Sequence, residues 1–292
     1  MDLFLNIVLG GLLIGGIYSL VAMGLSLQYG VARVLNIAHG EFLMFGAFIT
    51  FWLQQNNVDP LLTIVIVGPF MFVVGFVLYR TIFTTIRLKS PNPGVFESNG
   101  LLAAFGIYLI VQNIARLVPD WGSTPHSYQY LASAVIIGGA PFQENRLVAA
   151  AFAVAVGIIF YIYIGRSRTG KAIRAAAQDA STAALMGVNI SNTLALCFGF
   201  GAAMAGVAGS LISICYPINT VMGLQYTVIA IVVVTLGGLG SIPGSFIGGF
   251  ILGVVGTAVS YTKWLGTDLA VPSYYLIFIL LLLLRPKGLF GK

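Results

Sequence analysis

"MDLFLNIVLGGLLIGGIYSLVAMGLSLQ", residues 1–28, is an apolar stretch that contains a single charged residue, Asp2. A transmembrane helix needs about 20 such residues to cross a hydrocarbon core of about 30 Å. A signal peptide would carry positive charge before its apolar run and a small-residue cleavage site after it, and this stretch has neither. We therefore expect the stretch to stay in the membrane as a helix.

The composition of the whole chain extends this expectation. Of 292 residues, 59% are hydrophobic and only 8% are charged, whereas a soluble domain carries about 25% charged residues. Further apolar blocks lie at 36–54, 61–79, 99–116, 147–165, 191–214, 224–240, 245–262 and 272–284. Because these blocks are continuous instead of alternating in ten-residue segments, we expect helices and not barrel strands. The sequence predicts an all-α integral membrane protein, a polytopic bundle of about eight or nine transmembrane helices in one domain, residues 1–292.

Two places in this pattern predict broken or re-entrant helices. The block 36–54 contains His39 and Glu41, which are costly in lipid. The blocks 224–240 and 245–262 are separated only by "GGLGSIPG". Irregular backbone at membrane depth is tolerated only where protein or a water-filled cavity surrounds it.

The basic residues predict the orientation of the chain. They gather in "RTIFTTIRLK" (80–89), "GRSRTGKAIR" (165–174) and "RPKGLFGK" (285–292). Because cytoplasmic loops retain Lys and Arg, we expect loops 80–98 and 166–190 and the C-terminus in the cytoplasm. The N-terminus lies outside if there are nine crossings and inside if one block is re-entrant. This topology explains the net charge of +6, so no nucleic-acid partner is expected.

Thirty-six glycines predict close helix packing. Helices in lipid associate through small side chains that allow their backbones to approach. Tight packing within one chain is the simplest interpretation, and several such faces also suit pairing with a second membrane subunit. The candidate packing residues are Gly199, Ala203, Gly206, Gly249 and Gly253.

The polar segment 166–190 is rich in alanine and predicts a short cytoplasmic helix over about 171–186. Gly170 marks its start and Gly187 its C-terminal stop. Lys171 and Arg174 fall in its first turn, where the helix dipole disfavours cations. Two interpretations of this segment remain: it is a solvated, positively charged loop, or it is a helix that docks in a partner's groove. The weak apolar stripe on this helix consists of Ile173, Ala177, Ala180 and Ala184.

Four motifs in chain order resemble a known family. They are "LNIAHGEFLMFGAF" (35–48), "GRSRTGKAIRAAAQDASTAALMGVNI" (165–190) followed by "FGFGAAMAGVAGSL", "VVTLGGLGSIPGSFIGGFILG" (233–253) and the terminal "LRPKGLFG". Together they are similar to the permease subunits of ATP-binding-cassette importers for branched-chain amino acids, the LIV or hydrophobic-amino-acid uptake (HAAT) group. The resemblance spans essentially the whole chain.

The resemblance implies a transport subunit of a bacterial inner membrane, without catalytic activity or a bound cofactor. Its partners would be membrane lipid, a second permease subunit (homologous or identical), cytoplasmic ATPase subunits and an extracytoplasmic substrate-binding protein. The segment 166–190 would couple the permease to the ATPase. The resemblance therefore favours the docking helix over the solvated loop. The chain has no G-x-x-x-x-G-K-[ST] phosphate loop. The substrate would be a branched-chain or other neutral amino acid, or alternatively urea, a short amide or another small organic solute.

"NIAHGE" is the candidate substrate pathway: Asn36, His39, Gly40 and Glu41. Ionisable groups inside a membrane by default face a cavity, a pathway or a partner. They could contact a zwitterionic substrate, with its carboxylate at a half-helix N-terminus and its ammonium near Glu41. The alternative is a capped turn at the cytoplasmic membrane edge, with Arg33 and Glu41 at the surface. A proton relay in a stand-alone secondary transporter is a weaker alternative. The sequence has no cluster of metal-ligating residues, so we expect no metal site.

Overall fold

The computed structural model describes residues 2–118, 121–122, 124–262, 269–285 and 288–290. In this part of the chain, six helices are long and apolar enough to cross a membrane. They are Leu3–Ala32, Pro60–Lys89, Pro93–Leu117, Glu144–Arg166, Ile190–Cys215 and Ile242–Ser260, and shorter apolar helices cover Met222–Gly237 and Pro272–Leu281. The predicted helical membrane fold is confirmed.

The boundaries of the membrane helices agree closely with the apolar blocks of the sequence. In chain order the elements are α1 (Asp2–Ala32), α2 (His39–Gln55), α3 (Pro60–Leu78), the π-helix η1 (Tyr79–Phe83), α4 (Thr84–Lys89), α5 (Pro93–Leu117), β1 (Ala134–Ile137), β2 (Ala140–Gln143), α6 (Glu144–Arg166), α7 (Arg168–Gln178), α8 (Ala180–Leu185), α9 (Ile190–Cys215), α10 (Met222–Gly237), α11 (Ile242–Ser260) and α12 (Ala270–Leu284). The antiparallel hairpin of β1 and β2 was not expected from the sequence.

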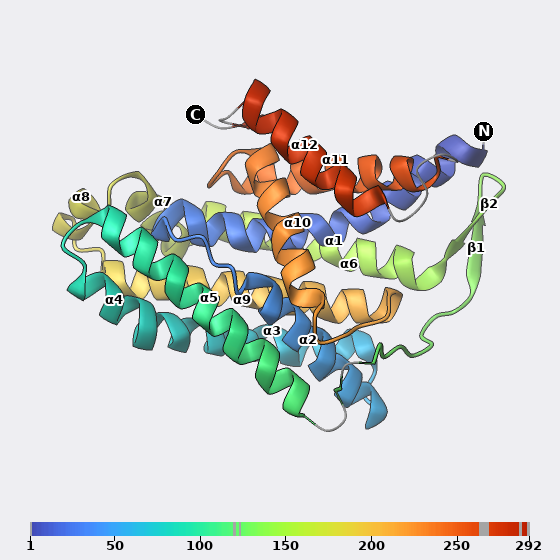
Figure 1. The fold of residues 1–292 in the computed structure, drawn as a ribbon, viewed down its shortest axis with the longest axis horizontal. Helices are drawn as coiled ribbons and strands as arrows, with labels where there is room; N and C mark the ends of the chain where they lie inside the picture. The colour runs from blue at the N-terminus through green and yellow to red at the C-terminus, as the bar shows by residue number, and fades with distance from the viewer. Residues whose placement is uncertain (1, 119–120, 123, 263–268, 286–287, 291–292) are drawn as a thin grey trace.

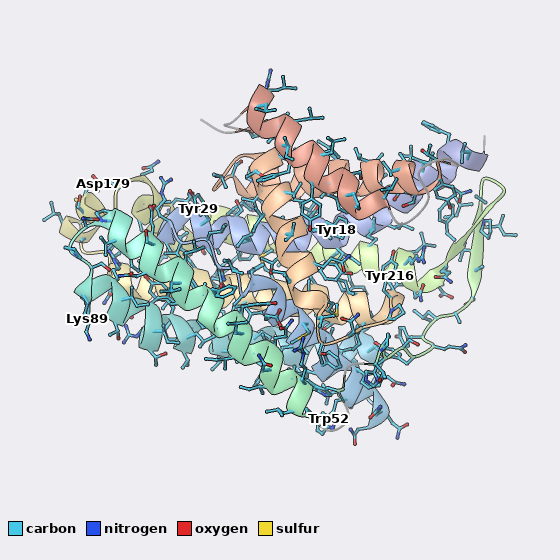
Figure 2. The ribbon with its side chains drawn as sticks, in the orientation of Figure 1. Tyr18, Tyr29, Trp52, Lys89, Asp179 and Tyr216 are labelled. Carbon is cyan, nitrogen blue, oxygen red and sulfur yellow. The ribbon has the colours of Figure 1, made fainter. Side chains whose placement is uncertain are left out.

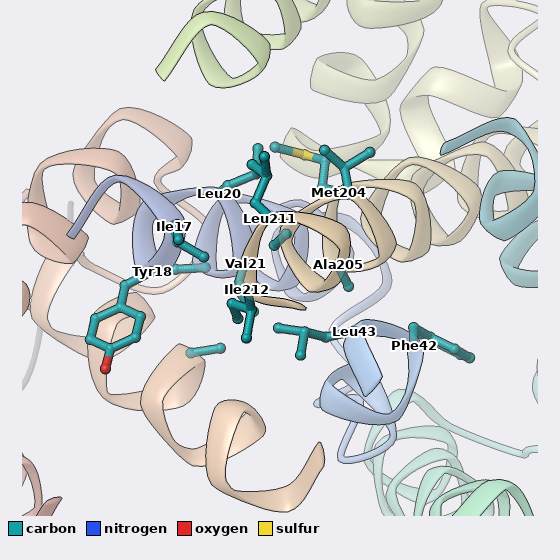
Figure 3. Close-up of a cluster of buried hydrophobic side chains, with 14 of the residues drawn as sticks. Ile17, Tyr18, Leu20, Val21, Phe42, Leu43, Met204, Ala205, Leu211 and Ile212 are labelled. Carbon is teal, nitrogen blue, oxygen red and sulfur yellow. The ribbon is translucent and has the colours of Figure 1, made fainter. Parts of the chain in front are cut away.

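Helices α1 and α9 form the centre of the bundle. Helix α1 packs against α11, α9, α6 and α10, and α9 packs against α3, α2 and α1. Figure 3 shows side chains of α1, α2 and α9 converging, among them Val21, Leu43 and Ile212. All three are almost completely buried. The polar residues that are buried along these helices, such as Gln28 and Ser210, are therefore surrounded by protein.

Glycine allows the closest of these helix contacts. A Cβ on Gly253 of α11 would overlap the backbone of Gly11 and Gly15 of α1, and one on Gly249 would overlap Ser19. On α9, a Cβ on Gly199 would overlap Phe72 of α3, and one on Gly206 would overlap Met71. Ala203 of α9 is half-buried. The α1–α11 and α9–α3 pairs thus both depend on small residues, as expected for helices in lipid.

The two ends of the bundle carry different elements. Figure 1 places α4, α7 and α8 at one end and the β1–β2 hairpin at the other. Lys89 and Asp179 lie at the first of these ends in Figure 2. The C-terminal segment is at the same end, because Leu289 N–H donates to Leu236 O (2.8 Å) and Gly240 lies against Gly30. The described residues of the three basic segments therefore share one end of the molecule.

The chain contains two copies of a three-helix unit that run in opposite directions. Helices α1, α2 and α3 correspond to α9, α10 and α11. Residues 33–38 separate α1 from α2, and 216–221 separate α9 from α10. Helices α2 and α10 have 17 and 16 residues, and α3 and α11 have 19 each. The contacts match as well: α1 packs on α11 as α9 packs on α3, and α10 packs on α1 as α2 packs on α9. This is an inverted repeat.

The predicted single helix over 171–186 is wrong, because the structure divides the segment at Asp179 into α7 and α8. Asp179 is extended (φ −153°, ψ 106°), and its carboxylate accepts hydrogen bonds from the N–H groups of Ser181 and Thr182. This is the geometry of an N-cap residue. The predicted stop at Gly187 is confirmed, since it follows α8 in the left-handed region (φ +87°).

Candidate functional site at the meeting of two helix starts

The segment between α1 and α2 is irregular backbone inside the bundle. Helix α1 ends at Ala32, and Arg33 takes a left-handed conformation (φ +57°) that turns the chain back. Residues 33–38 are not helical, yet Val34, Asn36 and Ala38 are buried. The predicted break in this apolar block is therefore present. It lies within protein, which is the condition for irregular backbone at membrane depth.

The side chain of Asn36 supports this break. Its Oδ1 accepts a hydrogen bond from Ala38 N–H (3.1 Å), and its Nδ2 donates to Gln28 Oε1 (3.2 Å). Gln28 in turn donates to the carbonyl of Phe198 in α9 (3.2 Å). Asn36 and Gln28 are both almost fully buried. Asn36 therefore has partners within the chain, and Gln28 is a supporting residue that the sequence interpretation missed.

His39 connects the start of α2 to α1 by one hydrogen bond. Its Nε2 lies 3.0 Å from the carbonyl oxygen of Val21, so this nitrogen donates. Val21 precedes the end of α1 at Ala32 by eleven residues, which is about 16 Å of helix at 1.5 Å per residue. The start of α2 thus lies about 16 Å along α1 from the C-terminal end of that helix.

Gly40 brings the starts of α2 and α10 into direct contact. A Cβ on Gly40 would overlap the carbonyl oxygen of Gly223, so only glycine fits. Gly40 N–H donates to Thr227 Oγ1 (2.8 Å), and this hydroxyl lies 3.0 Å from the carbonyl of Ile37. Thr227 is a second residue that the sequence interpretation missed. Figure 1 shows α2 and α10 crossing the centre of the molecule.

Glu41 is the ionisable residue at this crossing whose side chain makes no hydrogen bond. Its exposed fraction is 0%, and neither carboxylate oxygen makes a hydrogen bond. The carboxylate lies against Gly223, in the first turn of α10. The positive end of the α10 dipole therefore faces it. The alternative of a turn with Glu41 at the surface does not hold for Glu41, because this residue is fully buried within the bundle. Arg33 is exposed at the end of α1, as that alternative expected.

The two halves of the repeat start their second helices, α2 and α10, in the same way. Asn219 Oδ1 accepts from Val221 N–H (3.0 Å), as Asn36 accepts from Ala38. Asn36 precedes Gly40, and Asn219 precedes Gly223, by the same four residues. This shared Asn-x-x-x-Gly pattern was the signal for the second half of the site. Two helix N-termini and one free carboxylate can together interact with a zwitterion.

The predicted coupling residues lie at the basic end of the bundle. Arg174 donates to the carbonyl of Ile164 at the end of α6, so it caps the preceding helix. Lys171 is exposed, and a Cβ on Gly170 would overlap the Ile164 backbone. Within the stripe, Ile173 is buried, Ala177 and Ala180 are half-buried and Ala184 is exposed. The stripe therefore faces partly inward and does not form one free surface.

The tip of α8 carries apolar residues that the sequence interpretation missed. Leu185 and Met186 are 88% and 82% exposed. Hydrogen bonds from Ser181 and Thr182 hold the pKa of Asp179 well below its usual range, so this helix cap stays charged at neutral and mildly acidic pH. A large exposed apolar pair on a fixed short helix is typical of a protein contact surface.

The fold and this site define a multi-pass membrane transport protein. Over residues 7–285 the chain matches the family described as "Branched-chain amino acid transport system / permease component". The chain belongs to this family, so it is a permease subunit of a multicomponent transport system and not an enzyme.

Several characterised proteins resemble the chain along its whole length. The high-affinity branched-chain amino acid transport system permease protein LivH of Escherichia coli (strain K12) is 32% identical, with 99% of this chain and 96% of that protein covered. The corresponding protein BraD of Pseudomonas aeruginosa is 30% identical with the same coverage. Among solved structures, PsaBC from Streptococcus pneumoniae in complex with Fab matches with a TM-score of 0.50 and 14% identity, covering 98% of this chain and 93% of that chain. This last similarity concerns the fold alone.

Proposed function

We propose that the chain is the membrane permease of an ATP-binding-cassette importer for branched-chain or other neutral amino acids. Its partners in this proposal are two cytoplasmic ATPase subunits, a second permease and an extracytoplasmic binding protein. The bacterial relatives, named as branched-chain amino acid permeases, support this substrate class and a location in the inner membrane. The chain has no phosphate loop of its own, which supports a separate motor.

One observation carries the proposal: the Glu41 carboxylate is enclosed, has no hydrogen-bond partner and lies where the shorter helices α2 and α10 meet. Burying a charge without a partner costs free energy, so such groups in membranes mark substrate or ion pathways. A substrate ammonium would supply the missing partner, and the starts of α2 and α10 would favour the substrate carboxylate. Asn36 and Gly40 hold this arrangement in place, and His39 connects it to α1.

The experiment is amino-acid uptake by the complete importer in proteoliposomes. Glu41→Gln keeps the size of the side chain but removes the charge, and we expect uptake of leucine to fall by about a hundred-fold. Glu97→Gln changes an exposed glutamate of α5 and should leave uptake unchanged. Leucine uptake by Glu41→Gln at the wild-type rate would contradict the proposal.

We further propose that α7 and α8 dock on the ATPase and that this end of the bundle is cytoplasmic. Basic residues gather here, as expected for the cytoplasmic side, and Leu185 and Met186 offer an apolar contact at the tip of α8. Leu185→Asp should abolish co-purification of the ATPase while the permease keeps its elution volume. Leu88→Asp alters a leucine of α4 that is equally accessible, at 82% exposed, and should retain the ATPase. Equal retention by both variants would contradict docking through α8.

A further inference from the structure

A large cavity opens at the end of the bundle that carries the β1–β2 hairpin. Its volume is about 560 Å³, and its walls come from α1, β2, α6, α11, α12 and the residue that follows α9. This volume falls within the range of about 300–1,000 Å³ of small-molecule sites. The candidate site around Glu41 does not line it. The cavity therefore has no role yet in the proposed function.

Arg146 gives the cavity a positive charge. It is the third residue of α6, where the helix dipole disfavours a cation, so its position needs another reason. Its guanidinium lies 5.1 Å from the ring centroid of Tyr216, which also lines the cavity. Glu144 in the same turn accepts a hydrogen bond from Ser133 Oγ (2.5 Å). No Asp or Glu lines the cavity within the described part of the chain.

The remaining walls combine apolar, aromatic and uncharged polar surfaces. Leu13 and Ile14 of α1 provide an aliphatic wall, and Tyr18 and Tyr274 provide aromatic rings. A guanidinium binds a carboxylate through two parallel hydrogen bonds, an ammonium is attracted to the face of an aromatic ring, and an aliphatic side chain prefers apolar surface. These are the three parts of an aliphatic amino acid.

The floor of the cavity leads toward the Glu41 site. Tyr18 is buried and makes edge-to-face contacts with Tyr274 (centroids 6.2 Å apart) and with Tyr226 of α10 (6.4 Å). Tyr18 precedes Val21 by three residues, and Val21 is the residue that holds His39. One turn of α1 thus separates the cavity from the start of α2. Figure 2 shows Tyr18 and Tyr216 close together on the hairpin side of the molecule's centre.

We propose that this cavity is an outer vestibule that binds an aliphatic amino acid, with Arg146 on its carboxylate, and that the Tyr18, Tyr226 and Tyr274 rings separate it from the Glu41 site. The proposal rests on the proposed function, because it takes an amino acid as substrate. It adds a binding site and a specificity-determining residue within this single chain.

The test measures amino-acid binding directly, on the permease–ATPase complex in nanodiscs without the binding protein. We expect wild type to bind radiolabelled leucine at millimolar concentrations, and unlabelled leucinamide, which lacks the carboxylate, to compete poorly. Arg146→Gln should weaken leucine binding about ten-fold or more. Arg146→Lys, which keeps the charge without the planar fork, should weaken it less. Arg80→Gln, a change of an exposed arginine outside the cavity, should bind leucine as wild type does.

Other outcomes would overturn the vestibule. Leucine binding by Arg146→Gln equal to wild type would do so, as would no binding by wild type. Loss of binding-protein docking in Arg146→Gln, with leucine binding unchanged, would assign Arg146 to a docking surface instead. Loss of a co-purified anionic phospholipid, again with leucine binding unchanged, would make the occupant a lipid headgroup.

Uptake by the wild-type complete importer separates this proposal from the proposed function. Absence of leucine uptake by wild type would refute the proposed function. Normal wild-type uptake together with any of the overturning results above would refute only the vestibule.

Discussion

The segments that precede α2 and α10 have the same geometry and different chemistry. Each begins where a long helix ends, uses an asparagine to accept an N–H two residues on, and reaches a glycine at the crossing. The N-terminal segment then presents His39 and Glu41, whereas the C-terminal one presents Met222 and Leu224 at the equivalent positions. The shared residues therefore build the crossing, and the residues that differ identify which half carries the polar function.

This comparison separates fold from function within one molecule. If His39 and Glu41 were needed to form the crossing, the second half would need similar residues, and it forms the same geometry with apolar ones. An unpartnered buried carboxylate is costly, so its presence in one half points to a use outside folding. Exchanges between the two halves can test this division.

The largest effect is expected at the glycines of the crossing. A methyl group on Gly40 would overlap the backbone of Gly223, whereas one on Gly223 would overlap the movable side chain of Glu41. Overpacking of a core costs about 1–3 kcal/mol and more where backbone must shift. We expect Gly40→Ala to abolish assembly and Gly223→Ala to lower the melting temperature. Thermal-stability measurements by size-exclusion chromatography would compare them.

A second substitution checks the cause of these losses. Shortening the carboxylate with Glu41→Asp should restore stability to Gly223→Ala, because it removes the overlapping atoms. It should not rescue Gly40→Ala, whose clash is with backbone. Equal tolerance of alanine at both positions would break the proposed difference between the two sides of the crossing.

Glu41→Leu makes the N-terminal half resemble the C-terminal half, which has Leu224 at this position. The exchange removes a buried carboxylate that has no hydrogen-bond partner, a group that costs about 1–3 kcal/mol or more to bury. We therefore expect a higher melting temperature together with loss of leucine uptake. A lower melting temperature would show that the carboxylate stabilises the fold and would contradict its assignment to transport.

Much of this fold could be predicted from the sequence, because long apolar blocks have few alternatives in a membrane. The ends of α6, α9 and α11 lie within a few residues of the expected blocks. The break before α2 was also predictable, because His39 and Glu41 interrupt an apolar run. These features depend on local composition, which a single sequence displays directly.

The features that the sequence did not predict depend on contacts between distant segments or on a single helix-capping residue. The inverted repeat shares only short patterns such as Asn-x-x-x-Gly, so the equivalence of Gly40 and Gly223 becomes evident only when their helices meet. The division of the 170s helix follows from Asp179, whose cap competes with the helix-forming alanines on both sides. The cavity around Arg146 draws its walls from five elements and the residue after α9, which no periodicity brings together.

The two asparagines should differ in how much stability they contribute. Asn36 accepts from Ala38 N–H and also donates to Gln28 within the bundle, whereas Asn219 is half-buried and accepts from Val221 N–H. A buried hydrogen bond contributes about 0.5–1.5 kcal/mol, and an orphaned buried partner costs about 1–3 kcal/mol. Asn36→Ala should therefore lower the melting temperature more than Asn219→Ala. Equal shifts would show that the Gln28 contact contributes little.

The smallest effect is expected for His39→Met, which introduces the residue found at the equivalent position, Met222. The variant loses the hydrogen bond from Nε2 to the Val21 carbonyl, and we expect a loss of about 0.5–1.5 kcal/mol of stability. Because Val21 lies within α1, its carbonyl can keep its helical hydrogen bond, so the start of α2 should remain in place. Leucine uptake should then fall only a few-fold, and His39→Gln, which retains a donor, should recover part of the stability. If His39→Met instead lost uptake as completely as Glu41→Leu while its melting temperature stayed unchanged, His39 would have to act on the substrate. The division of roles between the two residues would then be wrong.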